Sequence, residues 1–339
     1  MTEPFGHLPS GEAAKLYTLK LGSLTARVTD YGATLVSLLV PDKYGIAADV
    51  VLGYDDAMGY HKGWAFLGAT VGRNANRIKG GRFKLNRKTF LLMPFDRGNN
   101  LHSGFAFLHR RMWQVEKSCE NAIIFRLDSP HKDQGFPGNA VIRVTYALEA
   151  PATLRIAFDA ISDKDTVFNF TNHSYFNLAG HDHPEKAMGQ ILTMPSECFL
   201  PCDKTGIPTG ELRSVDGTPM DFRHGKALGR DIDADYQPLK LQHGYDHCFV
   251  VASNPCAVLR DPESGRTMTV STDCPGVQLY TGGAPKATGK GGIVYGGRNA
   301  VCLETQFFPD SVNHPEWKQP FTQANTPYHS ETRFHFSSE

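Results

Sequence analysis

The sequence lacks a net charge: lysine plus arginine and aspartate plus glutamate each total 35 among 339 residues. A balanced chain has no summed field that would attract nucleic acid, anionic lipid or another highly charged partner. No stretch reaches the roughly eighteen consecutive apolar residues of a membrane-spanning helix. The start, Met-Thr-Glu-Pro-Phe-Gly-His-Leu-Pro, lacks the basic and apolar regions of a signal peptide. We therefore expect a cytoplasmic protein with a small neutral ligand and no nucleic-acid or membrane partner.

Cysteine pairs and several catalytic motifs are also missing. The seven cysteines, an odd number, include no Cys-x-x-Cys pair, which favours reduced, partly buried thiols over disulfides or a zinc knuckle. There is no His-Glu-x-x-His zinc helix and no Gly-x-Ser-x-Gly elbow, so metallohydrolase and serine hydrolase hypotheses have no support. Residues 283–290 resemble a phosphate loop, but five residues instead of four separate the glycines, and Gly291 replaces the required Ser or Thr. A nucleotide site is therefore not expected.

Long helical patterns are scarce, and a periodicity of two dominates the chain. In Ala152–Ala160, the residues Leu154, Ile156 and Phe158 share one face, which is typical of a half-buried antiparallel strand. Only short helices are expected, such as Lys226–Ile232. No internal repeat or low-complexity linker divides the sequence, so we predict an all-β fold, a large antiparallel β-sandwich formed by one domain spanning residues 1–339. Further strands are expected at Lys15–Leu21, Leu24–Thr29, Thr34–Val40, Met112–Lys117, Ala122–Leu127, Ile142–Leu148, Thr267–Ser271, Val277–Tyr280, Val301–Phe307 and Tyr328–Phe336.

Two histidines stand in polar surroundings. His102 lies in Asn-Asn-Leu-His-Ser-Gly and His173 in Thr-Asn-His-Ser-Tyr, where amides and hydroxyls surround each imidazole. Histidine can give and take protons near neutral pH, because its ordinary pKa is about 6.5. Either histidine alone is better explained as a hydrogen-bonded surface or loop residue. Together with a carboxylate, they would suit proton transfer on a sugar.

Charged residues supply the remaining parts of such a site. Glu304 interrupts the apolar segment Val301–Phe308, on the same strand face as Cys302, and a carboxylate there is costly without a partner or a function. Asp246 lies between Tyr245 and His247, and Asn76 and Arg77 lie side by side. These side chains can form charged hydrogen bonds with hydroxyl groups, although surface salt bridges would explain them as well.

These residues carry a family resemblance. The chain resembles the aldose 1-epimerases, the galactose mutarotases, from about residue 10 to its C-terminus. The matching segments are Gly72–Ile78, Leu101–His102, Gln134–Gly138, Thr171–Leu178, Gly244–His247, Leu303–Glu304, Pro309–Ser311 and Asn313–Trp317. The resemblance implies the galactose mutarotase-like supersandwich, a β-sandwich with a sugar site on its concave face and no cofactor or metal. It also implies an isomerase of hexose metabolism that acts on a free aldose, as a monomer or homodimer.

The resemblance implies a role for each site residue. Glu304 matches the general base, His173 the general acid, and His102 a second histidine near the reacting end of the sugar. The positions that line the site and hold hydroxyls are matched by Asn76, Arg77, Tyr175, Asp246 and Gln278. Interconversion of α and β anomers requires a base for the C1 hydroxyl and an acid for the ring oxygen. We expect His173 to be protonated in the resting enzyme.

The loop after His102 departs from the family pattern, because Ser103-Gly104 replaces a frequent pair of glycines.

Three alternative functions remain. A hexose-6-phosphate epimerase would need basic side chains for the phosphate, with Arg73, Arg77 and Lys79 as candidates. A glycosidase would use Asp246 and Glu304 as its carboxylate pair. A sugar-binding module without activity would be favoured only if Glu304 or His173 were missing.

Overall fold

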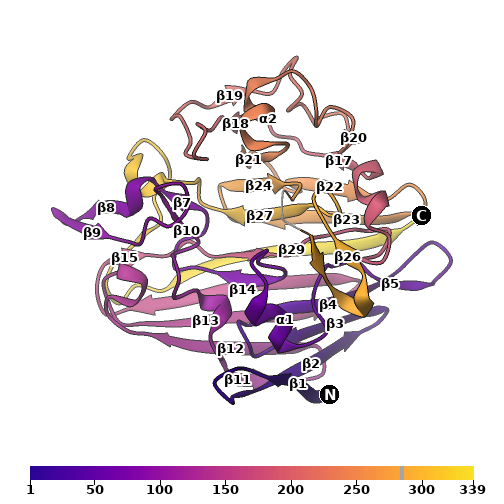
Figure 1. The fold of residues 1–339 in the computed structure, drawn as a ribbon, viewed down its shortest axis with the longest axis horizontal. Helices are drawn as coiled ribbons and strands as arrows, with labels where there is room; N and C mark the ends of the chain where they lie inside the picture. The colour runs from indigo at the N-terminus through magenta and orange to yellow at the C-terminus, as the bar shows by residue number, and fades with distance from the viewer. Residues whose placement is uncertain (283–285) are drawn as a thin grey trace.

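Three antiparallel sheets make up most of the fold (Figure 1). The computed structural model describes residues 1–282 and 286–339, so three residues of the phosphate-loop-like segment lie outside the described residues. The N-terminal sheet is five-stranded and follows chain order. Its strands are β1 (Thr2–His7), β2 (Ala13–Leu21), β3 (Leu24–Thr29), β4 (Thr34–Pro41) and β5 (Ala47–Asp49).

The largest sheet has nine strands and joins the middle of the chain to its C-terminus. The C-terminal strand β29 lies between β14 and β23, which places the end of the chain in the centre of this sheet. Its strands, in spatial order, are β11 (Gln114–Ser118), β12 (Ala122–Ser129), β13 (Ala140–Glu149), β14 (Thr153–Ser162), β29 (Tyr328–Ser338), β23 (Arg266–Thr272), β22 (Ala257–Arg260), β17 (Ile191–Thr193) and β20 (Lys226–Ala227).

The third sheet carries part of the candidate site. It has five strands, in the order β19 (Arg213–Ser214), β18 (Cys198–Leu200), β21 (Asp246–Val250), β24 (Gly276–Tyr280) and β27 (Cys302–Gln306). Short two-stranded ribbons complete the strands. They are β6 (Ala69–Val71) with β16 (Thr171–His173), β7 (Arg77–Ile78) with β10 (Asn100–Leu101), β8 (Arg82–Leu85) with β9 (Lys88–Leu91), β15 (Thr166–Val167) with β28 (Phe321–Thr322), and β25 (Ala287–Thr288) with β26 (Val294–Tyr295).

Helices are short. The described residues form two α-helices, α1 (Ala57–Lys62) and α2 (Gln237–Gln242), and the Asp56 side chain caps α1 by accepting from the N–H of Gly59. Single 3-10 turns occur at Lys79–Gly81, Leu108–Arg110, Asp133–Gly135, Lys290–Gly292 and Ser311–Asn313, and a longer one at Pro184–Gly189. No helix within the described ranges is long and apolar enough to cross a membrane.

One buried cluster of apolar side chains connects the three sheets. It includes Val28 of β3, Ile156 of β14 and Leu279 of β24, each almost fully removed from solvent. The alternation predicted for β14 is confirmed, because Leu154, Ile156 and Phe158 all lie in this core. The predicted all-β antiparallel fold and each predicted strand are therefore confirmed. All seven cysteines, which lie in the described part of the chain, are free thiols as expected.

The predicted helix at Lys226–Ile232 is wrong. Lys226 and Ala227 form β20 and pair with β17, and turns follow. Gly229 lowers helix propensity in the middle of this segment. The Lys226 ammonium also donates to the Asp231 carboxylate at 2.7 Å, which stabilises the turn instead.

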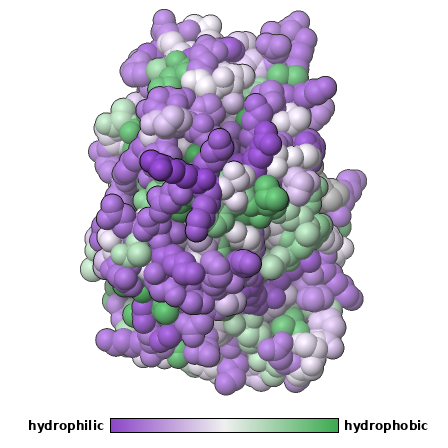
Figure 2. Space-filling view, turned by 90° about the vertical axis from the view of Figure 1, so that its left-hand side faces the viewer, coloured by the Kyte–Doolittle hydropathy of each residue, from purple (hydrophilic) through white to green (hydrophobic). Residues whose placement is uncertain are grey.

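The surface is mixed. Figure 2 shows the side of the molecule at the left of Figure 1, where most side chains are hydrophilic and apolar ones gather in a patch near mid-height. Exposed apolar side chains near β9 and β10 include Leu91, Met93 and Phe105.

Candidate active site

The ribbon β7–β10 brings two predicted site segments together. Leu101 pairs with Arg77, and the His102 N–H donates to the Asn76 carbonyl at 3.0 Å. Asn76 and His102 adopt φ values of 60° and 50°, in the left-handed region, where Asn and His are found more often than most residues. The Ser103 hydroxyl accepts from the Asn74 N–H at 2.8 Å and donates to the Asn74 carbonyl at 3.0 Å. Ser103, which stands where the family often has glycine, therefore links this loop to the backbone of Asn74.

Strand register brings the carboxylates together. Gln278 of β24 pairs with Glu304 of β27, and Tyr280 of β24 pairs with Asp246 of β21. Since side chains alternate along a strand, Asp246, Gln278 and Glu304 project from the same face of the sheet. The opposite face contributes Leu279 and Leu303 to the core. The face of the sheet turned away from this core thus carries the site.

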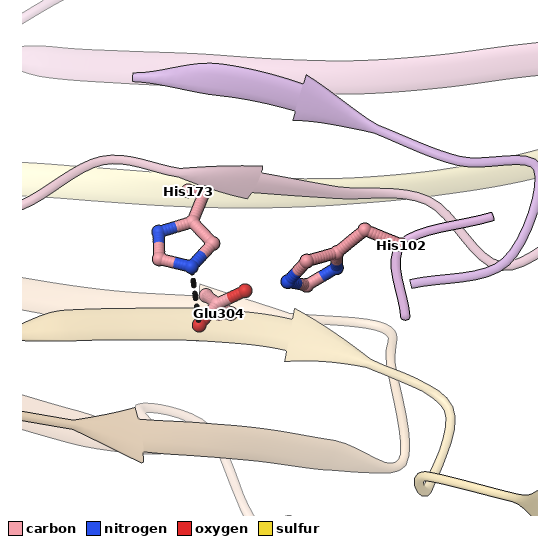
Figure 3. Close-up of side chains that lie close together, drawn as sticks. All are labelled: His102, His173 and Glu304. Atoms are coloured by element: carbon pink, nitrogen blue, oxygen red, sulfur yellow. Dashed lines mark ion pairs between the residues drawn. The ribbon is translucent and has the colours of Figure 1, made fainter. Parts of the chain in front are cut away.

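The side chains of Glu304, His173 and His102 converge, and we call them the reacting cluster (Figure 3). Strand β16 lies against β27 and directs Nε2 of His173 toward Oε1 of Glu304 at 3.6 Å. His102 enters from the loop after β10. The second carboxylate oxygen of Glu304, Oε2, is buried and has no hydrogen-bond partner. A buried oxygen without a partner is expected to accept a hydrogen bond from a ligand or water.

A cavity of about 280 Å³ opens above the reacting cluster. The structure brings seven of the eight predicted site residues to its wall: Glu304, His173, His102, Asn76, Arg77, Tyr175 and Asp246. Gln278 is the exception, since it is buried beside Asp246 and does not line the cavity. Its amide donates to Oδ1 of Asp246 at 2.6 Å. Gln278 therefore positions a lining carboxylate.

Burial shifts the pKa values of the reacting cluster in the directions that favour the neutral side chains. It lowers the pKa of His173 to about 4, even though Asp246 opposes the shift. Burial and the charge of Asp246 raise the pKa of Glu304 well above its usual value, with Arg77 opposing. Burial, followed by the proximity of His173 and Arg77, lowers the pKa of His102 well below its usual value.

These pKa shifts favour resting charges opposite to those expected from the sequence. The sequence led us to expect a protonated His173, held by nearby carboxylates. Instead, the ring stacks with Tyr175 and Phe66, at centroid distances of 5.0 and 5.8 Å, and loses most of its contact with water. Desolvation disfavours the charged form of each group and outweighs the opposing charge of Asp246 at His173 and of Arg77 at Glu304. In the ligand-free cavity the proton of this pair therefore resides on Glu304.

A second group of side chains is joined by hydrogen bonds and ion pairs around Arg77, and we call it the charged network: Arg77, Asp96, Asp246 and Gln278. Nε of Arg77 donates to Asp96 at 2.8 Å, and its NH1 lies 3.8 Å from Asp246. Burial alone would lower the pKa of Arg77, but the charges of Asp246 and Asp96 raise it. A guanidinium fixed between two carboxylates can present directed donors to sugar hydroxyls.

The reacting cluster has the composition of a metal site, with donor atoms that lie within 4.8 Å of one another. The tautomer of His102 does not suit a metal. The backbone N–H of Asn76 donates to Nδ1 of His102 at 3.2 Å, so the proton of the neutral ring is on Nε2. Metal-binding histidines show the opposite pattern, in which the second nitrogen donates. The atom of His102 that faces the cavity is thus a hydrogen-bond donor.

Several site residues were missed by sequence reasoning. Trp64, Phe66, Leu101 and Tyr280 also line the cavity, together with Ala65. Tyr280 follows Gln278 by two residues on the same strand, so the period of two could have indicated it. Asp96 and Trp64 lie in segments without strand periodicity, and only the folded chain reveals their contacts. Cys302, whose Sγ lies 3.5 Å from Nδ1 of His173, was noted only as a neighbour of Glu304.

Comparison with known proteins supports the family resemblance of the sequence. A family model described as aldose 1-epimerase matches residues 15–335. A galactose mutarotase from Mus musculus is 38% identical, and the match covers 98% of this chain and 97% of that protein. An aldose 1-epimerase from Escherichia coli is 34% identical over the same shares of the two chains. A galactose 1-epimerase structure from Lactobacillus acidophilus superposes with a TM-score of 0.86 at 28% identity, covering 99% of this chain and 98% of that one.

A full-length match to this family, with site residues gathered in one cavity, defines the class of protein. The chain belongs to the aldose 1-epimerase family and is an isomerase that acts on carbohydrates.

Proposed function

We propose that this enzyme interconverts the α and β anomers of free hexoses such as galactose and glucose. One observation carries the proposal: Nε2 of His173 and Oε1 of Glu304 lie 3.6 Å apart on the wall of a cavity, with Oε2 of Glu304 unpartnered. An imidazole and a carboxyl that share one proton provide both an acid and a base. The relatives named galactose mutarotase and aldose 1-epimerase support the same reaction.

Binding of the sugar prepares the pair. Hydroxyl groups that donate to Oε2 of Glu304 favour the carboxylate, because hydrogen bonds to a charged form stabilise it. The proton then moves from Glu304 to His173. This transfer leaves the total charge of the pair unchanged, so the low dielectric of the cavity opposes it less than it opposes a net gain of charge.

The reaction then proceeds in two halves. Glu304 takes the proton of the C1 hydroxyl while His173 protonates the ring oxygen, the bond between C1 and the ring oxygen breaks, and an open-chain aldehyde forms. After rotation about the C1–C2 bond, the former ring hydroxyl attacks the other face of C1 and returns its proton to His173. Glu304 returns its proton to the C1 oxygen. Acid–base assistance of this kind contributes about 10²–10⁴-fold in rate.

The other lining residues hold the sugar. Arg77, Asn76 and Asp246 offer donors and acceptors to hydroxyls, and Tyr175 supports the ring of His173. Nε2–H of His102 points into the cavity and can donate to an oxygen near C1. Fixed donors and acceptors orient the substrate without reorganisation during the reaction.

A phosphorylated sugar fits this cavity less well. Arg73, one of the candidate phosphate ligands, is fully buried, and its guanidinium donates to Ser129 and to the carbonyls of Pro137 and Gly138. Lys79 is exposed and does not line the cavity. Only Arg77 remains, and two carboxylates already neutralise it.

A glycosidase mechanism is also less well supported. Asp246 accepts from Gln278 at 2.6 Å through one oxygen, and its other oxygen lies 3.8 Å from Arg77, so both oxygens already have partners. A hydrolase would need its second carboxylate free to attack C1 or to activate a water. A cytoplasmic location, one domain for residues 1–339, and a monomeric or homodimeric state stay predictions.

Polarimetry tests the proposal directly. Freshly dissolved α-glucose, α-galactose, xylose and arabinose should each be followed with and without enzyme, after subtraction of the spontaneous rate. We expect accelerated mutarotation of at least galactose and glucose. No acceleration of any free aldose would contradict the proposed function.

A further inference from the structure

Strand β27 contacts both nitrogens of the His173 imidazole. Cys302 and Glu304 stand two residues apart on β27, so their side chains project from the same face of the strand. Nε2 of His173 lies 3.6 Å from Oε1 of Glu304, and Nδ1 lies 3.5 Å from Sγ of Cys302. The anomeric reaction uses Nε2 of this ring, but it gives no role to Nδ1 or to the thiol beside it.

The imidazole is also held on both of its faces. The rings of Tyr175 and Phe66 stack on it with interplanar angles of 25° and 20°. These contacts fix the plane of the ring. They do not fix which edge faces Glu304, because a half-turn about the Cβ–Cγ bond leaves the plane unchanged. A polar contact at Nδ1 distinguishes the two orientations, and Cys302 is placed to make that contact.

Cys302 differs from other buried cysteines in what its sulfur contacts. Buried cysteine ordinarily behaves as a small apolar side chain. Sγ of Cys248 and Sγ of Cys256 face backbone carbonyls at 3.9 and 3.4 Å, whereas Sγ of Cys302 faces an imidazole nitrogen. Burial and the negative charges of Glu304 and Asp246 raise the pKa of the Cys302 thiol well above its usual value. The sulfur is therefore a neutral thiol, which can accept or donate a weak hydrogen bond.

The backbone of His173 indicates the direction of this hydrogen bond. Burial lowers the pKa of His173, and a hydrogen bond from the ring to the residue's own backbone carbonyl opposes the shift. Nδ1 is the ring nitrogen on the backbone side, and a carbonyl oxygen can only accept. The proton of the neutral ring therefore lies on Nδ1. Sγ of Cys302 accepts from this N–H as well, and Nε2 keeps its lone pair toward Glu304.

The tautomer decides whether the ring can take part in proton transfer. The proton of Glu304 can pass to His173 only when Nε2 is unprotonated. A ring protonated on Nε2 would present a donor to Glu304 and could not receive a proton there. We propose that Cys302 is a positioning residue that holds His173 in the Nδ1–H tautomer, so that Nε2 receives the proton of Glu304 and passes it to the ring oxygen of the sugar.

A thiol suits this role because it is a weak and polarisable acceptor. A carboxylate at Nδ1, as in the Ser-His-Asp triad, stabilises the imidazolium. At His173 it would draw the proton to the ring before any sugar binds. The sulfur of Cys302 orients the ring but leaves the resting proton on Glu304. This proposal rests on the proposed function, because it concerns the proton that Glu304 and His173 exchange.

Nuclear magnetic resonance of the ligand-free wild type observes the tautomer without turnover. In protein labelled with ¹⁵N-histidine, long-range proton–nitrogen spectra distinguish a protonated ring nitrogen from an unprotonated one. The His173→Asn variant identifies the signals of His173 by their loss. At neutral pH we expect Nδ1 to be protonated and Nε2 to be unprotonated. A ring protonated on Nε2, alone or together with Nδ1, would overturn the proposal.

Variants of Cys302 test whether the sulfur is responsible. Cys302→Ala and Cys302→Val remove the acceptor, and valine keeps an apolar side chain in the strand. In both variants part of the His173 rings should adopt the Nε2–H tautomer, and kcat should fall about tenfold, comparable with the loss of one hydrogen bond. KM should stay close to that of the wild type, because Cys302 does not line the cavity. Cys302→Ser restores an acceptor and should recover most of kcat and the Nδ1–H tautomer.

A matched control is available at another buried cysteine. Sγ of Cys256 contacts the carbonyl of Val270 on β23, and the residue does not line the cavity. Cys256→Ala removes the same sulfur atom from the interior. It should leave kcat, KM and the ring signals of His173 unchanged.

The outcomes separate this proposal from the proposed function. Absence of acceleration of any free aldose by the wild type would contradict the anomeric reaction, whatever the tautomer of His173. In an active wild type, an unchanged kcat in Cys302→Ala and Cys302→Val would overturn the role of Cys302. A loss in Cys302→Ser or in Cys256→Ala as large as that in Cys302→Ala would overturn it as well, since packing would then explain the effect. If the Cys302 variants do not fold, the wild-type spectrum still decides.

Discussion

The reacting cluster and the charged network share one cavity, yet the pKa values of their buried groups shift in opposite senses: toward the neutral form in the first and toward the charged form in Arg77. Glu304 and His173 are buried with few polar contacts, and their pKa values shift toward the neutral forms. Arg77 is equally buried, but two carboxylates surround it and raise its pKa. A group that must exchange protons is left with few partners, whereas a group that must hold a substrate is fixed by several.

The largest effect is expected for the base. Glu304→Gln keeps the shape and hydrogen bonding of the side chain but cannot accept the C1 proton. Turnover should fall by about 10²–10⁴-fold while the sugar still binds. Initial polarimetric rates and calorimetric affinity measure the two effects separately. A variant that retains more than about a tenth of the wild-type rate would rule out Glu304 as the base.

His173→Asn should have a similar but smaller effect. The amide can still donate a hydrogen bond to the ring oxygen but cannot transfer a proton. We expect a loss of about 10²-fold in turnover, near the lower end of the range for acid–base groups. The same assay checks this expectation. An unchanged turnover would assign the acid to another group, with His102 as the first candidate because its ring centre lies 5.5 Å from that of His173.

A variant of the charged network should separate binding from chemistry. Arg77→Lys replaces a fork of donors by a single ammonium and removes the bond from Nε to Asp96. The Michaelis constant should rise about tenfold, since charged hydrogen bonds contribute roughly 1.5–3 kcal/mol. Steady-state kinetics supply both constants. If turnover collapses at an unchanged Michaelis constant, Arg77 belongs to the reacting cluster instead.

The smallest effect is expected from metal removal. Because Nε2 of His102 carries a proton, the reacting cluster should work without a metal ion. Prolonged treatment with EDTA, followed by desalting, should leave the mutarotation rate unchanged. A rate that is lost with EDTA and restored by added Zn²⁺ would show that the tautomer of His102 is different.

Sequence patterns predicted the strands and most of the site. The period of two located β14 and the other long strands, and it placed Glu304 on a strand face with Cys302. The resemblance identified seven residues that share one cavity wall. Short elements were harder, because Lys226 and Ala227 join a sheet only through pairing with β17, a contact between distant segments.

The charges of the reacting cluster could not be predicted in the same way. The pKa of His173 depends on the rings of Phe66 and Tyr175, and the first of these lies in a segment without a recognisable pattern. Arg73 and Arg77 differ by only four positions in the sequence. Yet Arg73 donates to neutral oxygens in the interior and Arg77 faces the cavity between carboxylates. Burial and partners arise from the fold as a whole, so residue type and spacing do not specify them.

The pH dependence of kcat/KM in the wild-type enzyme tests the central claim most directly, because it reports the ionisation of the free enzyme. Turnover requires one proton on the Glu304–His173 pair. As pH falls through about 4, His173 gains a second proton and the pair loses its base. As pH rises through the elevated pKa of Glu304, the pair loses its acid. We therefore predict a fall near pH 4 on the acid side and another on the alkaline side, at a pH well above the ordinary pKa of a glutamate. An acid limb centred near pH 6.5 would show that His173 titrates as an ordinary histidine and would contradict the account.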